Sequence, residues 1–297
     1  MNHAVDTAPL PAEAFAAPPA DGRRVTRIRP PSTTLAGLAA SLRTLVHYRD
    51  LVYTLTAHRI RVRYKQSLLG AAWAILQPLS LMLIYTVVFS LFARMPSEGK
   101  PYAVFAYTAL LPWTLFSTAL TNATNGLVSH AQLVTKVYFP REILPISYVL
   151  AAVFDFVVAS TVLAGLLAYY GVGLTVQVLW AIPLVLVLVL FVTGLSLAMS
   201  AVQVVFRDVG VAMPLLLQLW MFASPVVYPL SAVPERFQAA YALNPMVGVI
   251  ESFRRVVLDG AAPDWGTLGV SALVSVAVLA AGYAFFKHRE ATLADVI

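Results

Sequence analysis

Residues 71–93 read AAWAILQPLSLMLIYTVVFSLFA, a run without a single charged side chain. At roughly 1.5 Å per residue a helix over this run is about 34 Å long, and the hydrocarbon core of a bilayer is about 30 Å thick. Directly before it, residues 58–65 read HRIRVRYK and supply four cations of Arg and Lys, which remain beside anionic headgroups at a membrane surface. The two stretches together predict a first transmembrane helix that follows a basic segment in the membrane interface.

The whole chain has the composition of an integral membrane protein. Of its 297 residues, 60% are apolar and 11% are charged, and its mean hydropathy is +0.79, whereas an ordinary soluble domain is about 25% charged. The apolar stretches predict an all-α fold with six spans. These spans cover about residues 71–93, 102–123, 143–170, 176–202, 213–230 and 265–286. The fifth span is short and is interrupted by prolines.

The segments before the first span differ from the rest of the chain. Residues 1–34 are rich in alanine and proline and show no apolar periodicity, which predicts a disordered tail. Residues 35–66 carry apolar side chains at helical spacing with basic ones between them, and they predict an amphipathic helix in the membrane interface. Residues 67–297 form the expected six-span domain. The candidate residues at the end of the interface helix are Arg59, Arg61, Arg63, Tyr64 and Lys65.

The distribution of basic residues predicts the orientation of the chain. Six spans place both termini on one side, and the segments on that side carry 15 Lys and Arg residues against 5 on the other. Because basic residues are retained in the cytoplasm, both termini are expected there, in a protein of the cytoplasmic (inner) membrane. Ten of the basic residues precede the first span, so the net charge of +6 belongs largely to a membrane-surface segment, and nucleic-acid binding is not expected.

An unusual outer segment, residues 231–260, separates the fifth and sixth expected spans. Pro234 is suited to begin one short helix, and Asn244 with Pro245 supplies an N-cap and a first helical residue for another. Apolar residues from Met246 to Val257 then form a stripe along the second helix. Non-helical turns at membrane depth are tolerated only against protein or water. The two helices are therefore expected to re-enter the outer leaflet and to pack on the bundle or to rim a pore.

The sequence offers little chemistry to a catalyst. None of its lysines lies in a G-x-x-x-x-G-K-[ST] nucleotide-binding loop, its histidines lie outside the expected spans without metal-ligand spacing, and it has no cysteine. We therefore expect no enzyme activity, no metal and no cofactor on this chain. Asp155 is the one ionisable Asp, Glu, Lys, Arg or His well inside an expected span. It is either a substrate or proton site, or a protonated or hydrogen-bonded carboxyl that pairs with a hydroxyl in the bundle interior.

Aromatic side chains suggest a conduit for substrate. Tyr85, Phe89 and Phe92 recur on one face of the first span, and Trp220 and Phe222 lie in the fifth. Aromatic faces stack on sugar rings, so such a stripe beside a conduit suits a carbohydrate polymer. The alternative is that these residues simply pack between helices or form an interfacial belt, as aromatic residues commonly do in membranes.

Residues 125–142, NGLVSHAQLVTKVYFPRE, predict a short surface helix on the cytoplasmic side. One interpretation is a loop that positive charge anchors at the membrane. The other is a helix that docks in a groove of a cytoplasmic partner. The residues that would make this contact are Gln132, Lys136, Tyr138, Phe139, Pro140, Arg141 and Glu142.

Five short motifs follow one another along this layout. They are RYKQSLLGAAW at 63–73 leading to QP at 77–78, KVYFPREILP at 136–145, FRD at 206–208, SPVVY at 224–228 and LNP at 243–245. Together they resemble the transmembrane (permease) subunits of ABC-2 type polysaccharide exporters, which export O-antigen, capsule and teichoic acid. The resemblance covers the chain from about residue 40 to its end.

The resemblance implies a homodimer around one central conduit, with two copies of a separate ATPase subunit that bind ATP and Mg. It implies a gate-like interface helix within residues 35–66, a coupling helix within 125–142, and outer gate helices within 231–260. The expected function is ATP-driven export of a lipid-linked polysaccharide, with membrane lipids as further partners. Two alternatives stay open: an ABC-2 permease for a drug or a lipid, and a channel or proton-driven carrier without an ATPase.

Overall fold

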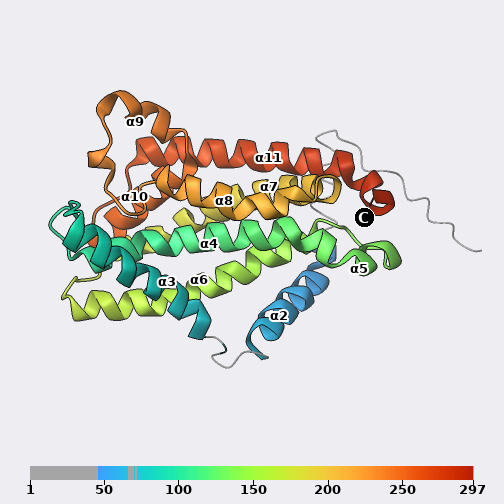
Figure 1. Cartoon of the computed structure of the whole chain (residues 1–297), viewed down its shortest axis with the longest axis horizontal. Coiled ribbons are helices and arrows are strands. Elements are labelled where there is room, and N and C mark those ends of the chain that lie inside the picture. The colour runs from blue at the N-terminus through green and yellow to red at the C-terminus, as the bar shows by residue number, and fades with distance from the viewer. Residues whose placement is uncertain (1–45, 66–69, 71, 297) are drawn as a thin grey trace, which may run out of the picture. The chain divides into compact units, whose positions relative to one another are not determined.

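The computed structural model describes residues 46–65, 70 and 72–296, and these residues form helices joined by short connections (Figure 1). The expected tail over residues 1–34 lies outside the described residues, as does the first part of the expected interface helix. The elements, in chain order, are α2 (Arg49–Lys65), α3 (Ala72–Tyr85) with a π-helical continuation (Thr86–Phe92), α4 (Tyr102–Ser129), α5 (Ala131–Lys136), α6 (Ile143–Tyr169), a 3-10 turn (Val176–Trp180), α7 (Ala181–Val205), α8 (Asp208–Phe222), a 3-10 turn (Leu230–Ala232), α9 (Glu235–Ala242), α10 (Pro245–Leu258) and α11 (Trp265–Val296).

Five helices within the described part of the chain are long and apolar enough to cross a membrane. They cover Ala72–Phe92, Tyr102–Ser129, Ile143–Tyr169, Val176–Val205 and Trp265–Glu290, and they match five of the six expected spans. The remaining expected span, 213–230, corresponds to α8, which begins earlier and ends at Phe222 after 15 residues. The chain then turns at residues 223–228. Pro225 in this turn and Pro229 directly after it cannot donate the hydrogen bonds that would continue a helix.

Helix α4 is the centre of the bundle. Of its most apolar stretch 83% is buried, against 11% for α3, and α3, α6, α7, α8 and α10 all pack against it. In Figure 1, α4 runs between α6 on one side and the pair α7 and α8 on the other. Because other helices cover most of α4, this helix has little contact with the hydrocarbon of a bilayer.

Helices α7 and α11 pack with their backbones in close approach at two glycines. A Cβ atom placed on Gly282 of α11 would lie 2.1 Å from the carbonyl oxygen of Gly194 on α7. A Cβ atom on Gly194 would in turn lie 2.6 Å from the Cα atom of Leu279. Small residues at a helix crossing allow this approach, and they are typical of helix pairs in membranes.

The two short helices expected between the last two spans are present as α9 and α10, at the end of the bundle opposite α5 (Figure 1). The predicted cap is confirmed, because Asn244 Oδ1 accepts a hydrogen bond of 3.1 Å from the backbone N–H of Met246, and Pro245 is the first helical residue. The Asn244 side chain also joins α10 to α8. Its Oδ1 accepts from Trp220 Nε1 at 3.2 Å, and its Nδ2 donates to the carbonyl of Ala223 at 3.2 Å.

Candidate functional site

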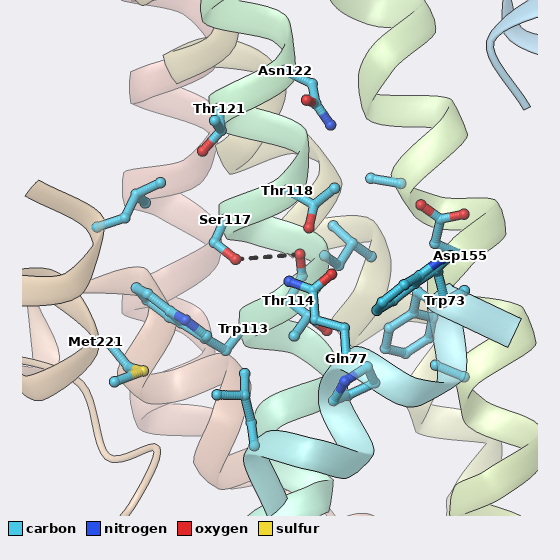
Figure 2. Close-up of a pocket in the computed structure, with 18 of the residues that line it drawn as sticks. Trp73, Gln77, Trp113, Thr114, Ser117, Thr118, Thr121, Asn122, Asp155 and Met221 are labelled. Carbon is cyan, nitrogen blue, oxygen red and sulfur yellow. Dashed lines mark hydrogen bonds between the residues drawn. The ribbon is translucent and has the colours of Figure 1, made fainter. Parts of the chain in front are cut away.

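A cavity of about 630 Å³ opens between α2, α3, α4, α6 and α8. Figure 2 shows its lining, with Trp73 and Gln77 from α3 facing a row of polar side chains on α4. The lining residues that carry polar or aromatic groups are Arg63, Tyr64, Trp73, Gln77, Tyr85, Trp113, Thr114, Ser117, Thr118, Thr121, Asn122, Asp155, Phe156 and Gln218.

The polar row on α4 is a consequence of helical spacing. Thr114, Ser117, Thr118, Thr121 and Asn122 recur every three or four residues, which places them on one face of the helix. Thr114 returns its hydroxyl to a backbone carbonyl of its own helix at 3.0 Å. Thr118, Thr121 and Asn122 make no side-chain hydrogen bond to another described residue, so their polar groups are available to a ligand. The row therefore offers hydroxyl and amide groups at membrane depth without offering charge.

The ionisable groups of this lining neutralise one another. Among the described residues around the cavity, Arg63 and Asp155 are the charged ones, and the Arg63 guanidinium forms a salt bridge with the Asp155 carboxylate. The Tyr64 hydroxyl donates a second hydrogen bond to Asp155. Burial and the neighbouring Asp155 carboxylate raise the pKa of Tyr64, so the phenol keeps its proton and acts as the donor. The lining as a whole is thus polar but close to neutral.

The position of Asp155 was predicted from the sequence, but its cationic partner was not. The interpretation of a carboxyl bonded to a neighbouring hydroxyl agrees with the contact from Tyr64. The salt bridge was missed because Arg63 lies outside every expected span. Helix α2 packs along α6. This packing places Arg63, at the basic end of α2, next to Asp155, which lies within an expected span.

The aromatic residues predicted to line a conduit do not form one surface, although two of them, Tyr85 and Phe89, are in contact. Tyr85 lines the cavity and its hydroxyl contacts the sulfur atom of Met221 at 3.3 Å, and Phe89 packs against Tyr85 with ring centroids 5.7 Å apart. Phe92 is 78% exposed, and Phe222 is also exposed. Trp220 packs between two other aromatic rings, with centroids 5.2 Å from Phe116 and 5.9 Å from Phe191.

Tyr85 is therefore the one member of this predicted set that faces the described cavity, and the packing interpretation holds for Trp220. The aromatic residues that do line the cavity beside it include Trp73 and Trp113. A signal for this site was present in the sequence: five hydroxyl or amide residues at helical spacing interrupt an otherwise apolar second span. Aromatic residues alone could not show which face of a helix points inward.

The predicted docking segment divides into an exposed part and a buried part. Gln132, Lys136 and Tyr138 are exposed, Tyr138 to 71%. Phe139 is buried against the core, and Glu142 is 0% exposed. The prediction that Phe139 and Glu142 present their side chains to a partner is thus not supported by the geometry, because both side chains are already covered by this chain.

The remaining residues of this segment attach it to the end of α11. The Arg141 backbone N–H donates to Glu290 at 3.3 Å, and its guanidinium donates to the Glu290 carbonyl, while Pro140 is half-buried. The Lys287 ammonium lies 2.6 Å from Glu142 Oε1 and 2.9 Å from Glu290 Oε2. This ion-pair cluster fixes the segment after α5 to the last long helix.

The candidate residues at the end of the interface helix point in two different directions. Arg61 and Lys65 are exposed, whereas Arg59, Arg63 and Tyr64 turn toward α6. Arg59 Nε donates to Ser147 Oγ at 2.6 Å, and its guanidinium carbon lies 3.3 Å from the centroid of the Tyr148 ring.

Within the described parts of the chain, no group of three or more His, Asp or Glu side chains could hold a metal ion.

Comparison with known proteins gives consistent matches over most of the chain. A model of the ABC-2 type transporter family matches residues 50–258. The O-antigen export system permease protein RfbA of Myxococcus xanthus is 33% identical over 258 residues, which are 86% of this chain and 98% of the relative. RfbA of Klebsiella pneumoniae is 28% identical over 84% of this chain and 95% of the relative. The polysialic acid transport protein KpsM of Escherichia coli is 25% identical over 80% of this chain and 93% of the relative.

Proposed function

The chain belongs to the ABC-2 type transporter family, and from this premise we propose that it is the permease subunit of an ATP-driven exporter of a lipid-linked polysaccharide such as O-antigen. It is a multi-pass membrane protein and a transport component rather than a catalytic one. Its relatives are named for the export of O-antigen and for the transport of polysialic acid, both of which are polysaccharides.

The observation that carries the proposal is the chemistry of the cavity beside α4. A glycan presents hydroxyl groups that donate and accept hydrogen bonds, and flat faces of C–H bonds that pack on aromatic rings. For the hydroxyl groups, the cavity offers the unpartnered polar groups of Thr118, Thr121 and Asn122. For the C–H faces, it offers the aromatic rings of Trp73 and Trp113. An apolar drug or a lipid tail would instead leave these polar groups unpaired at membrane depth, which is unfavourable.

The energy source belongs to a partner in this proposal. Two copies of a separate ATPase subunit would bind ATP and Mg, and a homodimer of this chain would enclose the conduit. Both termini and the α5 end would face the cytoplasm, in the inner membrane, and the exposed side chains of Gln132, Lys136 and Tyr138 would contact the ATPase. The ion-pair cluster around Lys287 joins the segment after α5 to α11. When the ATPase displaces this segment, α11 would therefore move with it as a rigid body.

Purification of the chain with its ATPase tests the proposal directly. Lipid-linked glycans should raise the rate of ATP hydrolysis, and small amphiphiles should not. Stimulation by small amphiphiles alone would assign the chain to drug or lipid export. Full transport in vesicles that lack any ATPase, together with strong loss in an Asp155→Asn variant, would indicate a channel or a proton-driven carrier.

The polar row on α4 leads to a first prediction. The double variant Thr118→Val/Thr121→Val keeps the shape of both side chains and removes two hydroxyls from the cavity. A hydrogen bond contributes about 0.5–1.5 kcal/mol, so the glycan concentration for half-maximal stimulation of hydrolysis should rise about tenfold. Thr161→Val, an exposed threonine of α6 outside the cavity, is the control. If both variants change this glycan concentration equally, the polar row on α4 does not contact the glycan.

The exposed part of the docking segment leads to a second prediction. Tyr138→Ala should weaken the association with the ATPase by about tenfold or more, because an aromatic anchor at an interface commonly contributes about 2 kcal/mol. Titration of the purified subunits measures the affinity. The control is Tyr169→Ala, which removes a tyrosine that is 82% exposed at the other end of α6. Phe139→Ala should instead lower the amount of folded protein, since that ring is buried.

A further inference from the structure

A second, smaller cavity lies between α2 and α6, near the end of the bundle that carries α5. Its volume is about 230 Å³, and its lining includes the basic side chains of His58, Arg59, Arg63 and His130. It shares Arg63 and Asp155 with the larger cavity, so the salt bridge between these two residues stands where the cavities meet. No function proposed above uses this cavity.

Arg59 is the cation in this cavity that lacks a counter-charge. One nitrogen of its guanidinium, Nε, donates to Ser147, and the plane covers the ring of Tyr148. Its Nη2 atom is buried and has no hydrogen-bond partner, and among the described residues Arg59 forms no salt bridge. Arg59 is only half-buried as a residue, but a guanidinium nitrogen that is covered without a partner is unfavourable. Burial accordingly lowers the pKa of Arg59.

The other groups that face the cavity do not supply this partner. Asp155 is the acidic residue of the described lining, and it already binds Arg63 and Tyr64. His130 is bonded through Nδ1 to the carbonyl of Gly126 at 3.0 Å, and burial followed by the charge of Arg59 lowers its pKa. The cavity therefore holds two arginines and one carboxylate, which leaves one positive charge in excess.

We propose that this cavity binds the phosphate ester anion of a lipid. Arg59 would turn its guanidinium so that Nη2, which is buried without a partner, donates to the phosphate oxygens. Arg63 would leave Asp155 to make a second contact, since guanidinium groups bind phosphate with paired hydrogen bonds. Asp155 would keep the hydrogen bond from Tyr64. The exchange would open the boundary to the larger cavity, so that an anionic head in one cavity lies next to a sugar chain in the other.

The source of the anion is either the diphosphate of a lipid-linked glycan or the headgroup of a membrane phospholipid. The first source rests on the function proposed above, whereas the anion site itself does not. Its test is independent of glycan-stimulated ATP hydrolysis, because it measures binding to the purified chain alone. If glycans fail to stimulate ATP hydrolysis, the anion site can still bind its probe, and if the probe fails to bind, the export function can still hold.

The binding experiment uses the full chain in phosphatidylcholine nanodiscs and labelled farnesyl diphosphate as the probe. Arg59→Gln should weaken binding about tenfold, as expected for the loss of a charge-assisted contact. Arg49→Gln on the same helix is the matched control, because its side chain is 81% exposed and lies beside Asp50 outside the cavity. Unchanged binding by Arg59→Gln, or an equal loss in the control, would overturn the proposal.

A second variant separates binding from folding. Asp155→Asn should tighten binding of the same probe severalfold, because Arg63 no longer has to leave a carboxylate, and a damaged fold cannot produce tighter binding. Weaker or unchanged binding would contradict the exchange at Arg63. Nanodiscs that contain phosphatidylglycerol identify the source: displacement of the probe supports a phospholipid headgroup as the occupant, and undiminished probe binding supports the diphosphate of the substrate.

Discussion

Replacement of Lys287 by methionine should lower the free energy of unfolding by about 3–5 kcal/mol, the range for a buried ion pair that loses one partner. The Lys287 side chain is 6% exposed and lies between Glu142, which is fully buried, and Glu290. Its removal takes away the one ammonium that pairs with both carboxylates. Denaturant or thermal unfolding of the purified protein in detergent measures the loss.

The destabilisation by Lys287→Met should depend on pH. Burial is the main cause that raises the pKa of Glu142, Glu290 adds to it, and Lys287 opposes it. In the variant the opposing charge is gone, so folded Glu142 holds its proton to a higher pH than unfolded Glu142 does. A carboxyl with a raised pKa stabilises the fold at low pH and loses this contribution as the pH rises from the unfolded to the folded value. The difference from the wild type should therefore be smaller at pH 5 than at pH 8.

Two further variants complete this test. Glu142→Gln combined with Lys287→Met removes both charges of the shorter contact and should recover a substantial part of the lost stability. Lys136→Met, which removes an exposed lysine of α5, should change stability by no more than about 0.5 kcal/mol. If Lys287→Met unfolds like the wild type, the cluster does not hold the segment after α5 to α11.

The long helices could be predicted from the sequence because charge-free runs of sufficient length have one stable arrangement in a bilayer. The fifth expected span shows where this reasoning ends. Hydropathy continued through residues 223–230, but the prolines there end α8 at Phe222. The N-cap at Asn244 was predictable for the opposite reason, since a cap depends on two adjacent residues and not on the packing around them.

The candidate site was predictable in position but not in detail. The basic end of α2, the segment after α5 and Asp155 could be singled out along the chain, because charge inside or next to an apolar run is visible in the sequence. The interface and docking roles of these residues stay predictions. The partners of these residues were not visible. Arg63 pairs with Asp155, and Glu142 pairs with Lys287, although the partners are far apart in the sequence. The first pair depends on the packing of α2 on α6, and the second on the packing of the segment after α5 on α11.

Gly282→Ala should be the second severely destabilising change, although it adds a single methyl group. The added Cβ would lie 2.1 Å from the carbonyl oxygen of Gly194, and the next nearest atoms also belong to the α7 backbone. A side chain could rotate away, but a backbone carbonyl within a helix cannot, so α7 and α11 must separate. Overpacking costs about 1–3 kcal/mol, and the contact with backbone places this variant at the upper end.

Gly269→Ala provides the matched control, because it makes the same substitution on the same helix. No atom lies within 4 Å of a Cβ at Gly269, and alanine favours a helix over glycine by about 1 kcal/mol, so this variant should be neutral or slightly more stable. Thermal unfolding of both variants in one detergent gives the comparison. Equal stabilities would mean that α7 and α11 are not in backbone contact, and the path from the α5 segment through α11 to the centre of the bundle would lose its rigid link.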